Sequence, residues 1–474
     1  MNAALSKKDE KSRDFSLNGP MWKVVLYVGG PLALYESLNQ LFKILDTMMA
    51  SHIGASAVSA VAYLSQINMM LSALGGGLAV GASIKVSQAY GAGQFEMVKK
   101  RVSTMFALCA VLGAAILVIL IPFTPQFLRL MNTPEEFIAE GSTYFRLELV
   151  GMVITFFNNV YIAIERARGN SNRILKLNLG VIAVKLGLTA WFVYGLGGGI
   201  NLISVATIIS QLLLLGAAVV NMNQKGNAFG FSLRAISMKK DVTAPMLLLS
   251  FPVIVEKIAF SMGKVIVNSM STVYGSLTVG ALGISNNIGG ITTNPQNGFQ
   301  QGGSSIIGQN LGAGKVKRAL SAFWWTLLFN VIIGAVLMTL SLIFLDQLSV
   351  LFAGDDTEFA GMIAEIYRFE AMGAIPLGVN AAVLALLYGF GKTKITLFMN
   401  FCRVFLFRVP VLWALQQFTD LGSVSAGIVM AVSNIASGVL AAVVGMIEIY
   451  RIRAEYREEN EEKQLTFAPF DGSL

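Results

Sequence analysis

The sequence predicts an all-α integral membrane protein with twelve transmembrane helices in two pseudo-symmetric lobes of six. Only 13% of its 474 residues are charged and 55% are hydrophobic, whereas a soluble domain carries roughly 25% charged residues. The hydrophobic residues gather in twelve segments, each long enough to cross a hydrocarbon core of roughly 30 Å. Because lipid offers the backbone no hydrogen bonds, such segments must be helices. The second half of the chain also repeats the first.

The repeat is clearest in a six-residue motif. Gln88-Ala-Tyr-Gly-Ala-Gly93 recurs 221 positions later as Gln309-Asn-Leu-Gly-Ala-Gly314. The same offset, followed by a slip of one residue, pairs identical residues elsewhere: Pro31 with Pro252, Lys43 with Lys264, Gly77 with Gly298, Gly81 with Gly302, Glu148 with Glu370, Asn158 with Asn380 and Asn178 with Asn400. The chain is therefore two copies of one unit.

The apolar segments define the expected elements and domains. We expect helices near 22–50, 56–86, 102–128, 138–165, 174–195, 201–222, 244–273, 278–306, 319–345, 360–389, 395–418 and 422–450. The domains are then a charged and disordered N-terminal tail (1–21), an N-lobe (22–222), a polar linker (223–243), a C-lobe (244–450) and a charged C-terminal tail (451–474).

Basic residues predict the orientation in the membrane. They lie in alternate loops and in both tails, and the loop members are Lys99, Lys100, Arg101, Arg166, Arg168, Arg173, Lys225, Arg234, Lys239, Lys240, Lys315, Lys317, Arg318, Lys392 and Lys394. Cytoplasmic loops carry this excess, so we expect both termini and the linker in the cytoplasm. Because six spans is an even number, the two copies run in the same direction, related by an axis along the membrane normal.

Several functions are disfavoured. The only histidine is His52, and the two cysteines, Cys109 and Cys402, lie in apolar segments, which argues against a metal site, a histidine-based triad and a disulfide. The glycine runs at 75–77 and 195–199 lack the Lys-Ser/Thr of a phosphate-binding loop. The net charge of +8 is explained by orientation rather than by nucleic-acid binding. We therefore expect neither an enzyme nor a cofactor.

Polar residues inside the predicted spans point to a cavity. An ionisable residue in a membrane costs at least a few kcal/mol and usually faces a cavity or a partner. The first predicted span of the N-lobe (22–50) carries Glu36, Gln40, Lys43 and Asp46 at helical spacing. The first span of the C-lobe (244–273) carries Glu256, Lys257, Lys264 and Asn268, and the span near 360–389 adds Glu370. We expect these residues to line one polar cavity for a small-molecule substrate.

The chain resembles the multidrug and toxic-compound extrusion (MATE) family, within the superfamily of multidrug, oligosaccharidyl-lipid and polysaccharide flippases. The resemblance rests on the six-plus-six repeat, on Gln-x-x-Gly-Ala-Gly after spans 2 and 8, and on Asp46 eight residues before Gly54. Asn400-Phe-Cys-Arg403 and Arg408-Val-Pro410 in span 11 add to it. It implies two lobes forming a V, alternating access, and export of organic compounds driven by inward flow of Na⁺ or H⁺.

The resemblance also implies roles for individual residues. Asp46 corresponds to the coupling carboxylate, and Asn178 to an Asn that assists it in one branch of the family. A further Asp of that branch is replaced here by Ile182, with Lys185 nearby, which weakens the case for a full Na⁺ site and leaves Na⁺ and H⁺ both open. Glu370 resembles an acidic position of another branch, although an interfacial pair with Arg368 is an alternative.

The leading hypothesis is a monomeric antiporter of the bacterial inner membrane that exports small cationic or amphipathic drug-like compounds. The alternative is a flippase or exporter of an anionic or lipid-linked substrate. Its basis is a set of intramembrane lysines that would favour phosphate or carboxylate groups: Lys43, Lys185, Lys257 and Lys264. Pairing of these lysines with Glu36, Asp46 and Glu256 would favour the first hypothesis, and unpaired lysines the second.

Overall fold

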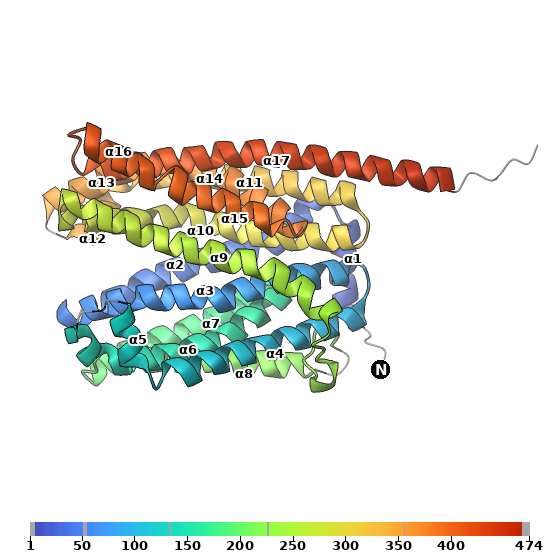
Figure 1. The fold of residues 1–474 in the computed structure, drawn as a ribbon, viewed down its shortest axis with the longest axis horizontal. Coiled ribbons are helices and arrows are strands. Elements are labelled where there is room, and N and C mark those ends of the chain that lie inside the picture. The colour runs from blue at the N-terminus through green and yellow to red at the C-terminus, as the bar shows by residue number, and fades with distance from the viewer. Residues whose placement is uncertain are drawn as a thin grey trace, which may run out of the picture.

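The computed structural model describes residues 5–50, 55–131, 133, 135–224, 227–354 and 356–466. Within these ranges, the side chains outside the description are those of 43–44, 46–50, 55–63, 66, 136–137, 140 and 459–466. Every regular element that the described residues form is a helix, and the long helices run side by side along the bundle (Figure 1). The predicted all-α architecture is confirmed.

The first half of the chain contains a short N-terminal helix and the six predicted long segments. These are α1 (Lys7–Asn18), α2 (Met21–Ala50), α3 (Ala55–Gly91), α4 (Phe95–Leu120), α5 (Thr124–Leu130), α6 (Glu135–Ala167), α7 (Ser171–Ala190) with the π-helical turn η2 (Trp191–Gly195), and α8 (Ile200–Met222). The link to the second half contains only the short 3₁₀ turn η3 (Leu233–Ala235).

The second half repeats this order. It contains α9 (Lys240–Ser271), η4 (Thr272–Tyr274), α10 (Ser276–Gly312), α11 (Val316–Ile343), α12 (Leu345–Ala353), α13 (Thr357–Ala371), α14 (Ala374–Gly389), α15 (Thr393–Phe401), the π-helical turn η5 (Cys402–Leu406), α16 (Val409–Phe418) and α17 (Val424–Thr466). α3 and α10, which carry the repeated motif, are both followed, two residues after their last helical residue, by a glycine with positive φ: Gly93 at 74° and Gly314 at 72°. L-residues rarely adopt this conformation, so glycine ends both helices cheaply.

Nine helices in the described part of the chain are long and apolar enough to cross a membrane, and the pair α13 and α14, bent by 49°, makes a tenth candidate. Neither α2 nor α10 is among them. α2 carries four charged residues, and α10 is rich in Asn, Gln and Gly. Because both are too polar to face lipid all round, they need a polar partner inside the bundle.

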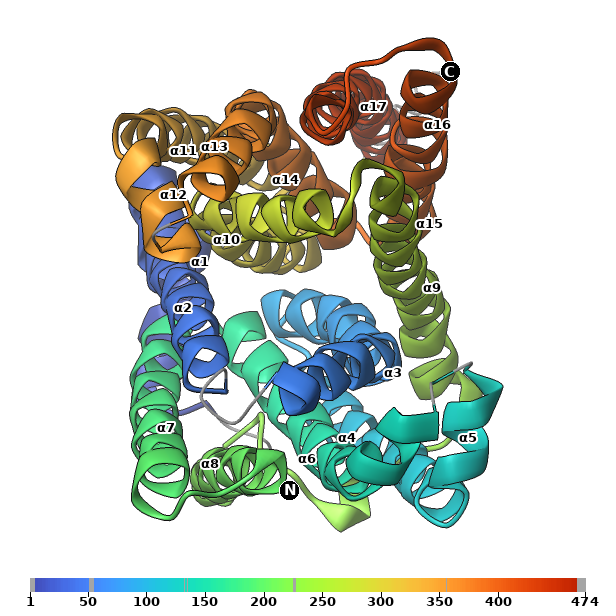
Figure 2. The ribbon, with the colours of Figure 1, turned by 90° about the vertical axis from the view of Figure 1, so that its left-hand side faces the viewer.

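The packing of the long helices follows the sequence repeat. α2 packs along α10, and α9, the equivalent of α2, packs along α3, the equivalent of α10. In the end-on view of Figure 2, α2 and α9 lie at opposite edges of the boundary between the two halves. The two halves are therefore joined by two equivalent pairs of helices, with the polar faces of α2 and α10 turned inward.

The hydrophobic core is divided between the halves. One cluster of buried side chains is built from the first half, around Phe145, Phe156 and Tyr161, with a small contribution from α9. Two further clusters lie largely in the second half. Each half thus has its own core, which leaves polar residues for the space between the halves.

Both predicted tails differ from expectation. The disordered N-terminal tail was a wrong prediction, because residues 7–18 form α1, which starts at Ser6, whose Oγ accepts a hydrogen bond from Asp9 N at 3.2 Å. α1 stays ordered because it packs against both halves. At the other end, α17 continues past Arg451 to Thr466 without a break. The cytoplasmic location of both termini stays a prediction.

Candidate functional site

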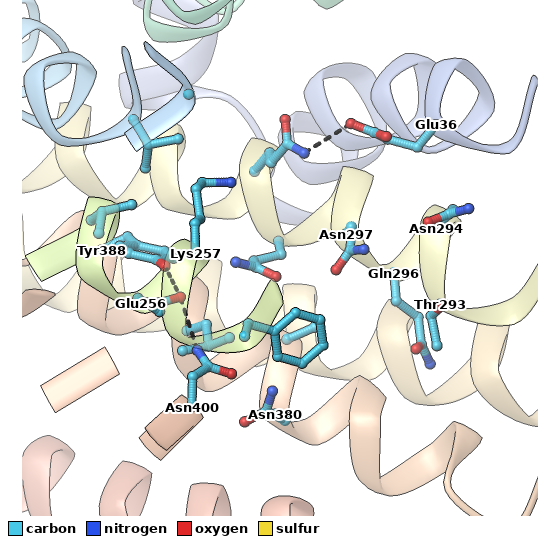
Figure 3. A pocket seen from close by; sticks show the side chains of 18 of the residues that line it. Glu36, Glu256, Lys257, Thr293, Asn294, Gln296, Asn297, Asn380, Tyr388 and Asn400 are labelled. Atoms are coloured by element: carbon cyan, nitrogen blue, oxygen red, sulfur yellow. Dashed lines mark hydrogen bonds between the residues drawn. The ribbon is translucent and has the colours of Figure 1, made fainter. Parts of the chain in front are cut away.

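A polar cavity lies between the two halves. Its volume is about 810 Å³, and it is lined by α2, α3 and α6 from the first half and, from the second, by α9, α10, α13, α14, α15, η5 and α17, with Arg408 just before α16. Figure 3 shows side chains from several of these helices pointing into it. This volume suits an organic molecule of drug size.

α10 supplies most of the neutral polar lining. Its inward face carries amides and hydroxyls at helical spacing: Asn286, Asn287, Thr293, Asn294, Gln296, Asn297, Gln300, Gln301, Ser304 and Ser305. Such groups both donate and accept hydrogen bonds. The surface can therefore hold polar ligands of different shapes without a fixed charge of its own.

Glu36 on α2 is connected to Arg166 on α6 through Gln301 on α10. Gln301 Nε2 donates to Glu36 Oε1 at 2.9 Å, and its Oε1 accepts a hydrogen bond from Arg166 Nη1. One amide thus joins an acid and a base from the same half of the chain through a helix of the other half. Since both charged groups face the cavity, a bound ion or substrate would compete for these bonds.

Among the described acids of the cavity, Glu256 on α9 accepts the most hydrogen bonds. Its Oε1 accepts from Tyr388 Oη at 2.8 Å and from Asn400 Nδ2 at 2.9 Å, and its Oε2 accepts from Thr396 Oγ1 at 2.7 Å. The residue is only 8% exposed. Three neutral donors, rather than a basic side chain, hold this carboxylate, so it can also bind a proton or a small cation.

Glu370 on α13 lines the same cavity and is close enough to two arginines to interact with them electrostatically. It accepts a hydrogen bond from Ser285 Oγ. Arg403 and Arg408 both donate to Asn434 Oδ1, at 2.9 and 3.3 Å, and line the same cavity. Glu370 is therefore a cavity residue. The alternative of an interfacial pair with Arg368 has no support from its position.

Lys257 is a basic group that points into the cavity (Figure 3). It is exposed there, and among the side chains that the structure describes it makes neither a hydrogen bond nor an ion pair. Lys264 also lines the cavity, with its Nζ 5.2 Å from the centre of the Phe260 ring. At Lys257, then, the described part of the cavity presents a positive charge to whatever enters.

A second, smaller cavity of about 270 Å³ lies within the first half. Asn178 lines it, and its Nδ2 donates to Ile174 O at 2.8 Å. Ile182 and Lys185 line it as well. Lys185 therefore places an ammonium-bearing side chain in the cavity that contains Asn178.

The predicted site residues divide into four groups. Those that line the large cavity are Glu36, Gln40, Glu256, Lys257, Lys264 and Glu370. Asn178 lines the small cavity. Asn268 lines neither cavity, because it lies one helical turn beyond Lys264 along α9. The side chains of Lys43 and Asp46 lie outside the described part of the chain.

Sequence reasoning overlooked several cavity residues. Tyr388, Asn400, Arg403 and Arg408 were not among the predicted site residues, and Arg166 was predicted to lie in a cytoplasmic loop, yet all five line the cavity. The intramembrane position of Arg403 and Arg408 was an available signal, since buried arginines in a span seldom face lipid. For Asn400 the signal was its equivalence to Asn178 in the repeat, whereas a tyrosine in an apolar helix carries no comparable signal.

A helical bundle with membrane-spanning segments and a polar internal cavity defines a multi-pass membrane transport protein. A family model, MatE, matches residues 31–191 and 252–414, one block in each half. The chain therefore belongs to the MATE family of multidrug efflux transporters, which are not enzymes.

Individual relatives agree with this family. The chain is 25% identical over 410 residues to the probable multidrug resistance protein YoeA of Bacillus subtilis (strain 168), covering 85% of this chain and 88% of YoeA. Its fold is similar to the crystal structure of MATE in complex with MaL6, with a TM-score of 0.89 and 20% identity over 95% of this chain and 100% of that one. A MOP superfamily transporter from Pyrococcus furiosus, described as having a binding pocket of reverse polarity, gives a TM-score of 0.87 at 21% identity, covering 93% and 98%.

Proposed function

We propose that this protein exports small organic compounds across the bacterial inner membrane by alternating access, driven by inward flow of H⁺ or Na⁺. The observation that carries the proposal is the cavity between the two halves, in which Glu256 is held by three neutral donors. Both termini and the linker 223–243 are cytoplasmic in this proposal, and residues 22–222 and 244–450 act as the moving lobes.

The coupling step follows from the cost of a buried charge. A carboxylate inside the membrane is cheaper when a proton or cation neutralises it. An ion that binds more tightly in one lobe arrangement therefore shifts the protein towards that arrangement. We assign this role to Asp46, assisted by Asn178, and to Glu256. Since Lys185 shares the small cavity with Asn178, a proton at the first-half site is favoured over Na⁺.

Two classes of substrate, which differ in charge, fit the cavity. Small cationic or amphipathic compounds remain the first; the relative YoeA is a probable multidrug resistance protein, a name that specifies no charge for its substrates. The second is an anionic compound, and Lys257 favours it. Its ammonium group is exposed to the cavity and, although Glu36 and Glu256 are near enough to interact with it electrostatically, it forms no close ion pair with a described side chain, so it can attract a carboxylate or phosphate group. The described lining contains more bases than acids: Arg166, Lys257, Lys264, Arg403 and Arg408 against Glu36, Glu256 and Glu370.

Reconstitution tests the proposal directly. Purified protein in liposomes is given either a Na⁺ gradient or a pH gradient, and the uphill movement of one cationic and one anionic dye is measured for each. We expect one gradient, and one class of dye, to support transport well above protein-free liposomes. Equal rates with and without the protein, for both gradients and both dyes, would overturn the proposal.

A further inference from the structure

The two copies of the repeated motif meet in space. α3 and α10 end next to each other, and their last glycines contact the opposite main chain. A Cβ atom on Gly91 would lie 1.9 Å from Gln309 O, and a Cβ atom on Gly312 would lie 1.9 Å from Gln88 O. No side chain fits at either position, so the repeated glycines allow the two halves to touch backbone to backbone.

The repeated glutamines cross the same boundary in opposite directions. Gln88 of α3 donates through Nε2 to Gly389 O at the end of α14, at 3.1 Å. Gln309 of α10 donates through Nε2 to Ala167 O at the end of α6, at 2.7 Å. Ala167 and Gly389 are themselves equivalent in the repeat, 222 positions apart. The two copies of the motif therefore make equivalent contacts: the glutamine of each half donates a hydrogen bond to the last carbonyl groups of a helix in the other half.

α1 covers this contact and is bonded to both motif copies. Arg13 donates to Tyr90 O at 3.1 Å and to Gly91 O at 2.7 Å. From the second half, Asn310 donates to Ser16 O at 3.4 Å. Figure 1 shows α1 at the end of the bundle where α3 and α10 finish. α1 thus joins the ends of α3 and α10 from outside.

Further bonds fix both ends of α1. At its N-terminal end, Asp9 forms an ion pair with Arg168, with 2.7 Å between Oδ2 and Nη2. At its C-terminal end, Lys315 donates to Leu17 O at 3.1 Å and Arg318 donates to Gly19 O at 2.8 Å. The first contact is with the first half and the other two are with the second. Separation of the halves at this end would therefore break bonds along the whole of α1.

The contact lies directly beyond the cavity. The lining of the cavity extends along α3 to Ser87 and along α10 to Ser305, and the glutamines and glycines follow within the next two turns. We propose that Gln88, Gly91, Gln309 and Gly312 form the gate that closes the transport cavity at the α1 end of the bundle, and that α1 stabilises its closed state. The gate rests on the alternating access of the proposed function, since only a cavity that opens on both sides needs one.

A cysteine reporter tests the gate without any substrate. Ser304→Cys places a thiol in the cavity lining, on the cavity side of the gate. Its labelling by a membrane-impermeant maleimide is measured from each side of the membrane, with the protein lacking the reporter as the blank for Cys109 and Cys402, both of which are buried. We expect slow labelling from the α1 side, which the basic loops predict to be cytoplasmic.

Gly312→Ala and Gly91→Ala should raise the labelling rate from the α1 side several-fold, because neither Cβ fits in the closed contact. Gly283→Ala is the matched control on α10, since no atom lies within 4 Å of its Cβ position. If either glycine variant does not fold, the double variant Gln88→Ala, Gln309→Ala takes its place. Labelling at the rate of the Gly283→Ala control in folded gate variants would overturn the proposal.

α1 has its own pair of variants. Asp9→Asn removes the charge paired with Arg168, whereas Asp14→Asn changes an exposed residue whose side chain, among the described residues, is bonded to Asn18 within α1 and to no residue of either half. We expect faster labelling from the α1 side for the first and no change for the second, and equal rates would remove α1 from the gate. If the gate variants label faster than their controls but the wild-type protein shows no gradient-driven transport, the proposed function is rejected and the closure of the cavity by these residues still stands.

Discussion

Gly81 on α3 packs against Ser250 on α9 so closely that a Cβ atom on the glycine would lie 2.3 Å from the serine Cα. The repeat reproduces this contact 221 residues on, where a Cβ atom on Gly302 would lie 2.8 Å from Gly29 Cα. Small residues allow helices in a membrane to approach this closely. Both pairs of helices that join the halves therefore depend on glycine at equivalent positions.

Gly81→Ala should destabilise the protein, because the added methyl group must push α9 away. Overpacking of this kind costs about 1–3 kcal/mol. Thermal unfolding in detergent measures the loss. Gly216→Ala on α8 is the control, because no atom lies within 4 Å of its Cβ position, and it should leave the midpoint unchanged or slightly raised. Equal midpoints for the two variants would contradict the close contact between α3 and α9.

Asp46→Asn should abolish uphill export without preventing folding. The substitution keeps the shape and removes the titratable charge, and loss of a charge inside the membrane seldom destabilises a protein. Gradient-driven dye export in proteoliposomes and dye binding are measured together. Export should fall to background while the variant stays abundant in the membrane.

Glu148→Gln is the control for Asp46. Glu148 on α6 accepts hydrogen bonds from Asn68 at 2.9 Å and Ser204 at 2.8 Å, and it lines neither cavity. We expect the larger part of wild-type export to remain in this variant. Full export by the Asp46→Asn protein would remove Asp46 from the coupling step.

Glu256→Gln should lower gradient-driven transport at least about ten-fold, equivalent to 1.4 kcal/mol. A carboxamide cannot bind and release a proton. Its NH₂ group is a donor, and it would face Tyr388, Asn400 or Thr396, which now donate hydrogen bonds to the carboxylate. Tyr388→Phe is the companion variant, since it removes one of the three hydrogen bonds and keeps the charge. The Tyr388→Phe protein should still transport, but the concentration of H⁺ or Na⁺ that gives half of the maximal rate should change. Wild-type transport by Glu256→Gln would show that coupling does not use this carboxyl group.

Lys257→Met should weaken the binding of anionic compounds about ten-fold or more, since a hydrogen bond to a charged group contributes roughly 1.5–3 kcal/mol. Cationic compounds should bind equally well or better. Lys394→Met, at an exposed position near the start of α15, should change neither. The affinities of the two variants for one anionic and one cationic dye are measured by dye binding to purified protein. A greater loss for the cationic dye would exclude the anionic substrate.

Arg168→Gln should destabilise the folded protein by up to about 3 kcal/mol, because buried Glu165 loses its closer basic partner and keeps only Arg173, at 3.4 Å. Burial lowers the pKa of Arg168, but the charges of Glu165 and Asp9 and their hydrogen bonds raise it overall. Glu165 is only 2% exposed and lies 2.8 Å from Arg168.

Arg129→Gln provides the contrast for Arg168→Gln. Arg129 pairs with Glu135 at 2.8 Å, but both side chains are exposed, and surface ion pairs contribute little. Its unfolding midpoint should match the wild type. Similar losses for the two variants would mean that burial does not decide the strength of these pairs.

The residues that line the cavity show where sequence reasoning stops. Glu36, Glu256 and Glu370 were predictable because a carboxyl group in an apolar segment is costly and needs a reason to be there. Tyr388 was not, since tyrosine is common in membrane helices, and Asn400 was marked only by its equivalence to Asn178 in the repeat. Their role appears only when α14 and α15 bring them to Glu256. The polar face of α10 was likewise visible as composition, but not as the wall of a cavity.

The sequence by itself determined the membrane location, the order of the helices and the twofold repeat, because hydrophobicity and periodicity are local properties. It also determined which intramembrane charges needed partners. Only the tertiary structure decided that α1 folds and packs on both halves, that Asn268 stays outside the cavity, and that the motif copies meet at Gly91 and Gly312. These facts depend on contacts between residues far apart in the chain, and no local pattern specifies which distant main chain a glycine will touch.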